Sequence, residues 1–204
     1  MKKFLFQKID PRNRQLMLVI SAILCLVYFI PVWKIVLKAP QYRDGLRLFI
    51  WLDKITGGNE FDLKNINILN HYVGMREIHA SDFSEFQYMP YILGIMIAGA
   101  LVTFFIPRVV MVLLGLLAFA STALAGLYDF HIWEYEYGHN LNPEAALSIP
   151  GISFEPPLLG CKAMMNFNTC SWPHAGATIL GVCGAILVYV LAFEFMMYKK
   201  SLKS

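Results

Sequence analysis

Apolar residues fill four long stretches of this chain, and more polar segments separate them. Each stretch contains about the 20 mainly apolar residues that a helix needs to cross a bilayer. The expected spans cover residues 16–37, 88–106, 109–128 and 174–198. The hydrophobic pattern therefore predicts an all-α membrane protein with four transmembrane helices.

The connections between these stretches predict the topology. The second and third spans are separated only by Ile106-Pro107-Arg108, so they form a tight antiparallel hairpin whose far ends lie on one side. The first span is of full length and is followed by bulky residues, which favours a retained helix over a cleaved signal peptide. We therefore expect a single polytopic membrane domain over residues 1–204, with ordered segments outside the membrane at 38–87 and 129–173.

The distribution of charge predicts the orientation. Lysines and arginines gather in the N-terminal tail, at Arg108 and in the C-terminal tail, whereas carboxylates outnumber them in residues 38–87 and 129–173. By the positive-inside rule, both termini and the hairpin are expected in the cytoplasm. The two long segments are then external, and they are periplasmic if the protein lies in the inner membrane of a Gram-negative bacterium.

The overall composition supports the membrane class and narrows the range of partners. Of the 204 residues, 57% are hydrophobic and only 15% are charged, well outside the balance of an ordinary soluble domain. The net charge of +3 is an average over two poles of opposite sign, so it gives no reason to expect nucleic-acid binding. The lipid bilayer is the first expected partner.

The first external segment opens with apolar and charged residues mixed together, from Tyr42 to Lys54. Such a mixture is typical of a helix that lies in the membrane interface, and Gly57-Gly58 would end it. The alternative is a covered helix packed against the spans.

A possible set of metal ligands follows in the same segment. If residues 67–79 are helical, His71, Met75 and His79 stand at i, i+4 and i+8 on one face. Imidazole and thioether together suit copper, because soft sulfur selects Cu(I) and imidazole accepts both copper oxidation states. In the alternative without a metal, His71 forms hydrogen bonds at the membrane surface, Met75 packs among apolar side chains and His79 is solvated.

The second external segment has a denser group of ionisable residues. Asp129, His131 and His139 alternate with aromatic residues that belong in an interfacial belt, and His174 stands at the start of the fourth span. An unpaired carboxylate is costly at the membrane boundary, so Asp129 needs a cation, a metal or a strong donor. We predict metal or proton roles for these four residues. The alternative is a polar network that ties the loop to the helix ends.

Two cysteines, Cys161 and Cys170, also fall in this second segment. A disulfide between them would suit an oxidising periplasm, and a disulfide or two inert thiols are favoured over a metal role. The remaining alternative is a copper site that uses these sulfurs with Met164 or Met165.

Several familiar sites are missing from the sequence. It contains no glycine-rich phosphate loop with Lys-Ser/Thr, no nucleophile elbow and no His-Glu-x-x-His motif, which argues against ATP hydrolysis and common hydrolases. It also contains no pair of histidines deep in facing spans that would hold a membrane haem.

Three runs of residues resemble a known group. They are Asn70-His71-Tyr72-Val73-Gly74-Met75, Tyr128-Asp129-Phe130-His131-x-Trp133-Glu134-Tyr135-x-Tyr137-Gly138-His139-x-Leu141-x-Pro143 and Pro156-Pro157-Leu158-Leu159-Gly160. Together they are similar to uncharacterised small four-helix bacterial membrane proteins associated with gene clusters of nitrous oxide reductase and its copper maturation. The resemblance covers about residues 16–195. It implies a copper-linked or respiratory accessory role, and it brings no ligand set with it.

These observations lead to one main functional hypothesis and two alternatives. The main one is a periplasm-facing protein that binds or transfers copper in denitrification, with a periplasmic cuproprotein or other membrane subunits as partners. Its predicted metal ligands are His71, Met75, Asp129, His131, His139 and His174. The first alternative is a scaffold subunit without a metal, and the weaker one is a copper-dependent membrane oxidoreductase. An enzyme is the less favoured class.

Overall fold

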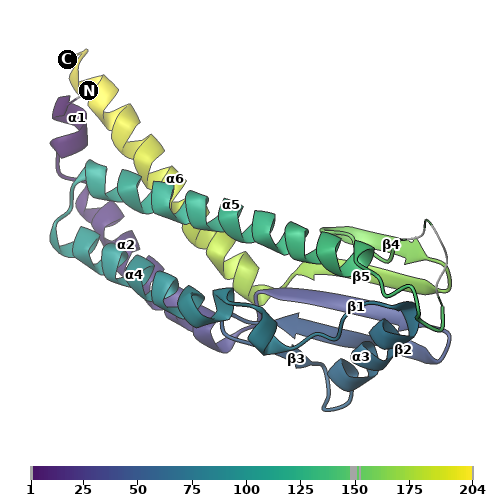
Figure 1. The fold of residues 1–204 in the computed structure, drawn as a ribbon. Helices are drawn as coiled ribbons and strands as arrows, with labels where there is room; N and C mark the ends of the chain where they lie inside the picture. Colours follow the sequence, from purple (N-terminus) through teal and green to yellow (C-terminus); the bar gives the residue numbers. More distant parts are fainter. Residues whose placement is uncertain (1, 148–150, 152, 204) are drawn as a thin grey trace.

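A computed structural model describes residues 2–147, 151 and 153–203, with a bundle of long helices at one end and a β-sheet at the other (Figure 1). Within those residues, four helices are long and apolar enough to cross a membrane. They are α2 (Pro11–Cys25) continued by the short η1 (Leu26–Phe29), α4 (Glu85–Phe105), α5 (Val109–His139) and α6 (Ala175–Ser201). The four predicted spans are thus supported as candidate membrane helices.

The fold is mixed α/β, so the all-α prediction is wrong. Five antiparallel strands form one sheet in the order β3-β2-β1-β5-β4. Their bounds are β1 Trp33–Ala39, β2 Tyr42–Ile50, β3 Ile55–Gly57, β4 Gly160–Met164 and β5 Phe167–Pro173. The two external segments therefore combine into one structure, because the first supplies β2 and β3 and the second supplies β4 and β5.

The segment after Tyr42 is a strand, and both helical interpretations of it are wrong. In β2, Leu46 and Leu48 are buried while Arg47 between them is exposed, which is the two-residue period of a strand. Leu48 pairs with Ile35 of β1. That partner strand lies within the predicted first span, where a continuous apolar run looks the same in a buried strand and in a helix.

The first and third spans have different ends from those predicted. The first begins at Pro11, where the Asp10 side chain accepts a hydrogen bond from the Arg12 N–H, and it ends at Phe29 instead of residue 37. The third continues to His139 instead of ending at residue 128. The second and fourth spans lie close to their predicted positions.

The helix α5 is longer than a membrane span requires. Its 31 residues extend about 46 Å, which exceeds a hydrocarbon core of about 30 Å. Phe130, Trp133 and Tyr137 pack in one apolar cluster with the sheet residues Ile35 and Leu48. A charged sheet with open edges is excluded from hydrocarbon, so this part of α5 lies outside the span. We call the sheet, α3 (Asp62–Val73), residues 129–139 of α5 and the loops between them the head.

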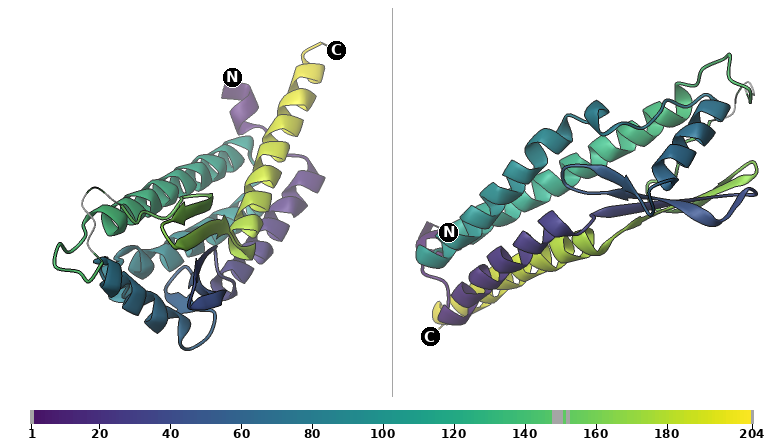
Figure 2. Two further views of the ribbon diagram at one scale, coloured as in Figure 1. Left: turned by 90° about the vertical axis from the view of Figure 1, so that its right-hand side faces the viewer. Right: turned by 90° about the horizontal axis from the view of Figure 1, so that it is seen from below.

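The connection between sheet and bundle is direct. The chain passes from η1 into β1 and from β5 into α6, and β1 pairs with β5, so the first and fourth spans are brought side by side. In the bundle, α2 packs against α4 and α6, and α5 packs against the same two helices. In the head, α3 and the end of α5 cover one face of the sheet (Figure 2).

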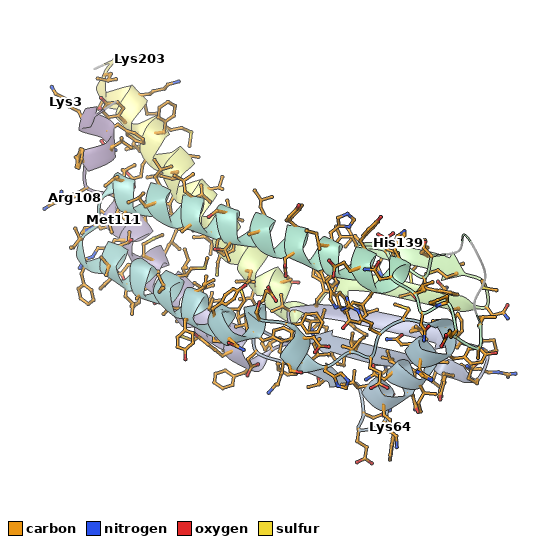
Figure 3. All side chains as sticks on the ribbon, viewed as in Figure 1. Lys3, Lys64, Arg108, Met111, His139 and Lys203 are labelled. Carbon is orange, nitrogen blue, oxygen red and sulfur yellow. A yellow bond between two sulfur atoms is a disulfide. The ribbon has the colours of Figure 1, made fainter. Side chains whose placement is uncertain are left out.

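Both chain ends and the α4–α5 connection lie at the opposite end of the molecule from the head (Figure 1). The Ile9 N–H donates to the Pro107 carbonyl at 3.0 Å, and the Val109 N–H donates to the Gln7 carbonyl at 3.2 Å. Lys3, Arg108 and Lys203 therefore lie together at this end, far from His139 (Figure 3). This is the arrangement that the predicted topology requires.

A buried carboxylate fastens α6 to the start of α2 near this end. Glu194 is only 4% exposed, and its Oε1 accepts hydrogen bonds from the Asp10 N–H at 2.8 Å and from the Asn13 amide at 2.6 Å. It therefore links two spans that lie at opposite ends of the sequence.

We expect Glu194→Ala to lower the free energy of unfolding by about 2 kcal/mol, because two donors lose their acceptor in a buried site. Glu194→Gln keeps an acceptor oxygen and should retain more of the stability. Unfolding of the purified protein in detergent micelles measures both variants. An alanine variant as stable as the parent would contradict the proposed link.

Candidate functional site

The predicted ladder of His71, Met75 and His79 does not form. Gly74 adopts a left-handed conformation with φ of 85° and ends α3, so Met75 and His79 lie beyond the helix. His71 stays in the last turn of α3 with an exposed side chain. The His79 ring instead lies 3.2 Å from the Glu77 carboxylate at the surface.

The three predicted residues that follow the third span all lie on α5. Asp129 and His131 are exposed, and two residues apart on a helix they point in different directions. The His139 ring stacks on Tyr135 with centroids 4.0 Å apart. Its Nδ1 is 3.0 Å from the Tyr135 carbonyl oxygen and 3.9 Å from the Glu155 carboxylate.

His174 is the N-cap residue of α6, with its ring against the edge of Phe49 at 5.4 Å. Across the part of the chain that the structure describes, no three His, Cys, Asp or Glu side chains gather as a metal site would require. The predicted histidines and Asp129 are thus not brought together. Cys161 and Cys170 form a disulfide between β4 and β5, which confirms that alternative and removes both thiols as copper ligands.

A cavity of about 60 Å³ lies inside the head, between the covered face of the sheet, α3 and the end of α5. By the usual criterion for buried water, it has room for several water molecules or one small ligand. Most of its lining is apolar. The residues that also carry a donor or acceptor atom include Asn70, Met75, Trp133, Glu134, Tyr137, Met164 and Thr169.

Glu134 is the unusual residue of this cavity. Its side chain has no exposed surface, and neither carboxyl oxygen has a hydrogen-bond partner among the described residues. The Thr169 hydroxyl, on β5 across the cavity, is also buried without a partner. Burial raises the pKa of Glu134 from 4.5 to about 8, and the nearby charge of Glu155 adds to the rise. The carboxyl is therefore protonated near neutral pH in the unliganded protein.

Close packing of a loop against α5 closes the cavity near Glu134. The Phe154 N–H donates to the Gly138 carbonyl at 3.0 Å, and a Cβ at Gly138 would overlap the backbone of Glu155. Lys162 on β4 donates to the Glu155 carbonyl at 3.1 Å and holds the loop from the other side. Phe154 itself is buried beside Met164. Residues 148–150 and 152 of this segment lie outside the described residues.

Of the six predicted ligands, Met75 alone lines this cavity. Met164, named from the sequence only as a companion of the two cysteines, lines it as well, and Glu134 and Thr169 were not predicted. A signal for Glu134 does exist. If the helix is continued to residue 139, Phe130, Trp133 and Tyr137 form an apolar stripe at helical spacing, and Glu134 falls within it. The predicted third span ended at residue 128, so residues 130–137 were not treated as a continuation of that helix.

A second hollow of about 420 Å³ lies at the tip of the head, separate from Glu134. Ile68 and Tyr72 of α3 line it on one side. Met165, in the β4–β5 turn, lines the other side with a φ of 53°, a conformation that is uncommon outside glycine. Among its lining residues tyrosine is the only ionisable type, and Gln41 and Asn166 add uncharged amide groups.

Comparisons with protein families, with curated proteins and with solved structures find no match to this chain.

Proposed function

We propose that this protein is a membrane-anchored accessory protein that binds Cu(I) in the cavity of its head. The observation that supports the proposal is the grouping of three side chains around one cavity: the thioethers of Met75 and Met164 and the unpartnered carboxyl of Glu134. The copper predicted from the sequence is retained. Of the predicted ligands Met75 is kept, and Met164 and Glu134 replace the four histidines and Asp129.

The chemistry of these donors favours a soft monovalent cation. An ionised Glu134 is costly in an apolar cavity unless a positive charge accompanies it, and one Cu(I) neutralises it. Thioethers select Cu(I) over hard cations such as Mg²⁺ or Ca²⁺, which require several oxygen ligands. The Thr169 hydroxyl is a further oxygen donor on the same cavity. Binding would displace the Glu134 proton, so copper affinity should rise with pH.

The direction of the head completes the proposal. The basic residues at the opposite end favour a cytoplasmic position for that end by the positive-inside rule, and with that orientation the head faces the periplasm. The Cys161–Cys170 disulfide is compatible with that oxidising compartment. In this position the protein would receive copper or pass it to a periplasmic cuproprotein, in agreement with its resemblance to proteins associated with nitrous oxide reductase maturation.

Titration of untagged protein with Cu(I), in competition with a chromophoric chelator and with ascorbate present, tests the proposal. We expect one bound ion per chain. Met75→Leu and Met164→Leu should each weaken binding by roughly tenfold or more, because each removes one soft donor at nearly constant volume. Met165→Leu is the matched control, because Met165 is next to Met164 in the chain but its side chain is half exposed and lies outside the cavity.

The same titration distinguishes this site from a histidine site. We expect His71→Ala and His131→Ala to bind copper like the parent, because neither side chain lines the cavity. A loss of copper in the histidine variants but not in the methionine variants would overturn the cavity site. Failure of the parent protein to bind Cu(I) would overturn the copper function itself.

A further inference from the structure

The uncovered face of the sheet carries a row of aromatic and basic side chains. Lys34 of β1 pairs with Phe49 of β2 on one side and with Trp172 of β5 on the other, so the three side chains share a face. They alternate with Trp33 and Ile50, which belong to the apolar cluster on the covered face. The row therefore points away from α3 and α5.

Ring contacts connect this row to its neighbours. The Lys34 ammonium lies 5.9 Å from the Phe49 ring centroid. Thr56 of β3 stands opposite Phe49, and its hydroxyl accepts a hydrogen bond from the Trp51 indole N–H at 2.9 Å. The Lys54 ammonium in turn lies 5.2 Å from the centroid of the Trp51 ring. We call Lys34, Phe49, Trp51, Lys54 and Trp172 the base row.

The base row lies where the spans leave the membrane. The first span ends at Phe29 and β1 begins at Trp33, while β5 ends at Pro173 directly before α6. The lipid headgroup region nearest the head is therefore at the level of Lys34 and Trp172. Tryptophan is enriched at that depth, and lysine side chains near it attract anionic lipids.

The charge of Lys34 is available for a ligand. Lys34 forms no ion pair with another described residue. Lys54, the other lysine of the base row, directly follows Asp53 in the chain, and this carboxylate offsets part of its positive charge. Lys34 is therefore the main cation of the base row. Trp172 next to it is 51% exposed, which leaves an aromatic surface on which the upper part of a lipid can rest.

We propose that the base row binds the headgroup phosphate of an anionic phospholipid, with Lys34 as the cation and Trp172 beside it. This site is separate from the Glu134 cavity and does not depend on copper. A lipid is the occupant that charge and depth favour together, because phosphate groups are concentrated at the level where the row lies.

A second lysine on the same strand supplies a matched control. Lys38 shares the face of Lys34, but it stands about 13 Å farther from the membrane along β1, beyond the screening length of about 8 Å at physiological salt. Lys38→Gln removes the same charge from the same face without touching the row.

The test measures phosphatidylglycerol binding to the whole purified protein in detergent, by native mass spectrometry and by the rise in melting temperature. We expect Lys34→Gln to weaken phosphatidylglycerol binding by roughly fivefold, the contribution of one lysine at an anionic surface. Lys34→Arg and Lys38→Gln should bind like the parent, and Trp172→Ser should weaken binding with the lysine intact. Phosphatidylcholine and free inorganic phosphate should not reproduce the rise in melting temperature.

Two results would overturn this site. One is an equal loss of lipid binding in Lys34→Gln and Lys38→Gln, which would mean that only the general charge of the sheet matters. The other is a parent protein that retains phosphatidylglycerol no better than phosphatidylcholine. If Lys34→Gln fails to fold, Trp172→Ser is compared with Lys38→Gln instead. Weaker lipid binding in Trp172→Ser alone would support the site, and equal binding in the two variants would overturn it.

Discussion

Raising the pH from about 4.5 to about 8 is expected to destabilise the metal-free protein, and Glu134→Gln is expected to remove most of this effect. In that range the Glu134 carboxyl is protonated in the folded protein but ionised in the unfolded chain. The folded state binds one more proton, so stability falls by about 1.4 kcal/mol for each pH unit. Between pH 4.5 and pH 8 the loss of folding stability due to Glu134 totals on the order of 4 kcal/mol. Outside this range the stability contribution of Glu134 changes little with pH.

Thermal unfolding in detergent, followed by tryptophan fluorescence at several pH values, measures this dependence. Glu136→Gln is the control, because Glu136 lies on the same helix but is exposed, 3.5 Å from Arg76. It should keep the pH profile of the parent. The same pH dependence in the parent and in Glu134→Gln would show that Glu134 is solvated or paired, and the cavity site would lose its main support.

The sequence predicted the bundle well because a long run of apolar residues is rarely compatible with anything except a membrane span. The span predicted at 88–106 is observed as Glu85–Phe105, and the one at 174–198 as Ala175–Ser201. The sheet was missed for a physical reason. Its central strands β1 and β5 adjoin spans, so the hydrophobic run continues from helix into strand at residues 30–33 without a change in composition. β1 is a strand because it pairs with β2, which follows it directly in the chain, and with β5, which lies far along the chain.

The candidate site was harder to predict than the fold. Met75 was selected for its sulfur, and it does line the cavity. The helical face that it was expected to share with His71 and His79 does not exist, because Gly74 ends the helix. Glu134 becomes notable only when α5 is continued past the membrane and a distant loop is placed over it. Neither fact is local in sequence. The histidines were predicted as ligands from their residue type alone, and among the described residues they do not gather into a metal site.

The loop over Glu134 depends on the lack of a side chain at Gly138, and Gly138→Ala is expected to lower the free energy of unfolding by about 3 kcal/mol. The added methyl group would overlap the Glu155 backbone, which cannot shift as a flexible side chain can. The hydrogen bond from the Phe154 N–H to the Gly138 carbonyl would break as the loop moves away. Thermal unfolding measures the loss of stability, and hydrogen exchange over residues 153–158 should accelerate.

Gly126→Ala is the control on the same helix, since nothing lies within 4 Å of a Cβ at that position. Alanine is the better helix former, so this variant should equal the parent or exceed it by up to about 1 kcal/mol. If Gly138→Ala behaved in the same way, the loop would not be packed against α5 as described. If it lost stability but kept tight Cu(I) binding, closure of the loop would not be needed to hold the ion, and Met75 with Met164 would suffice.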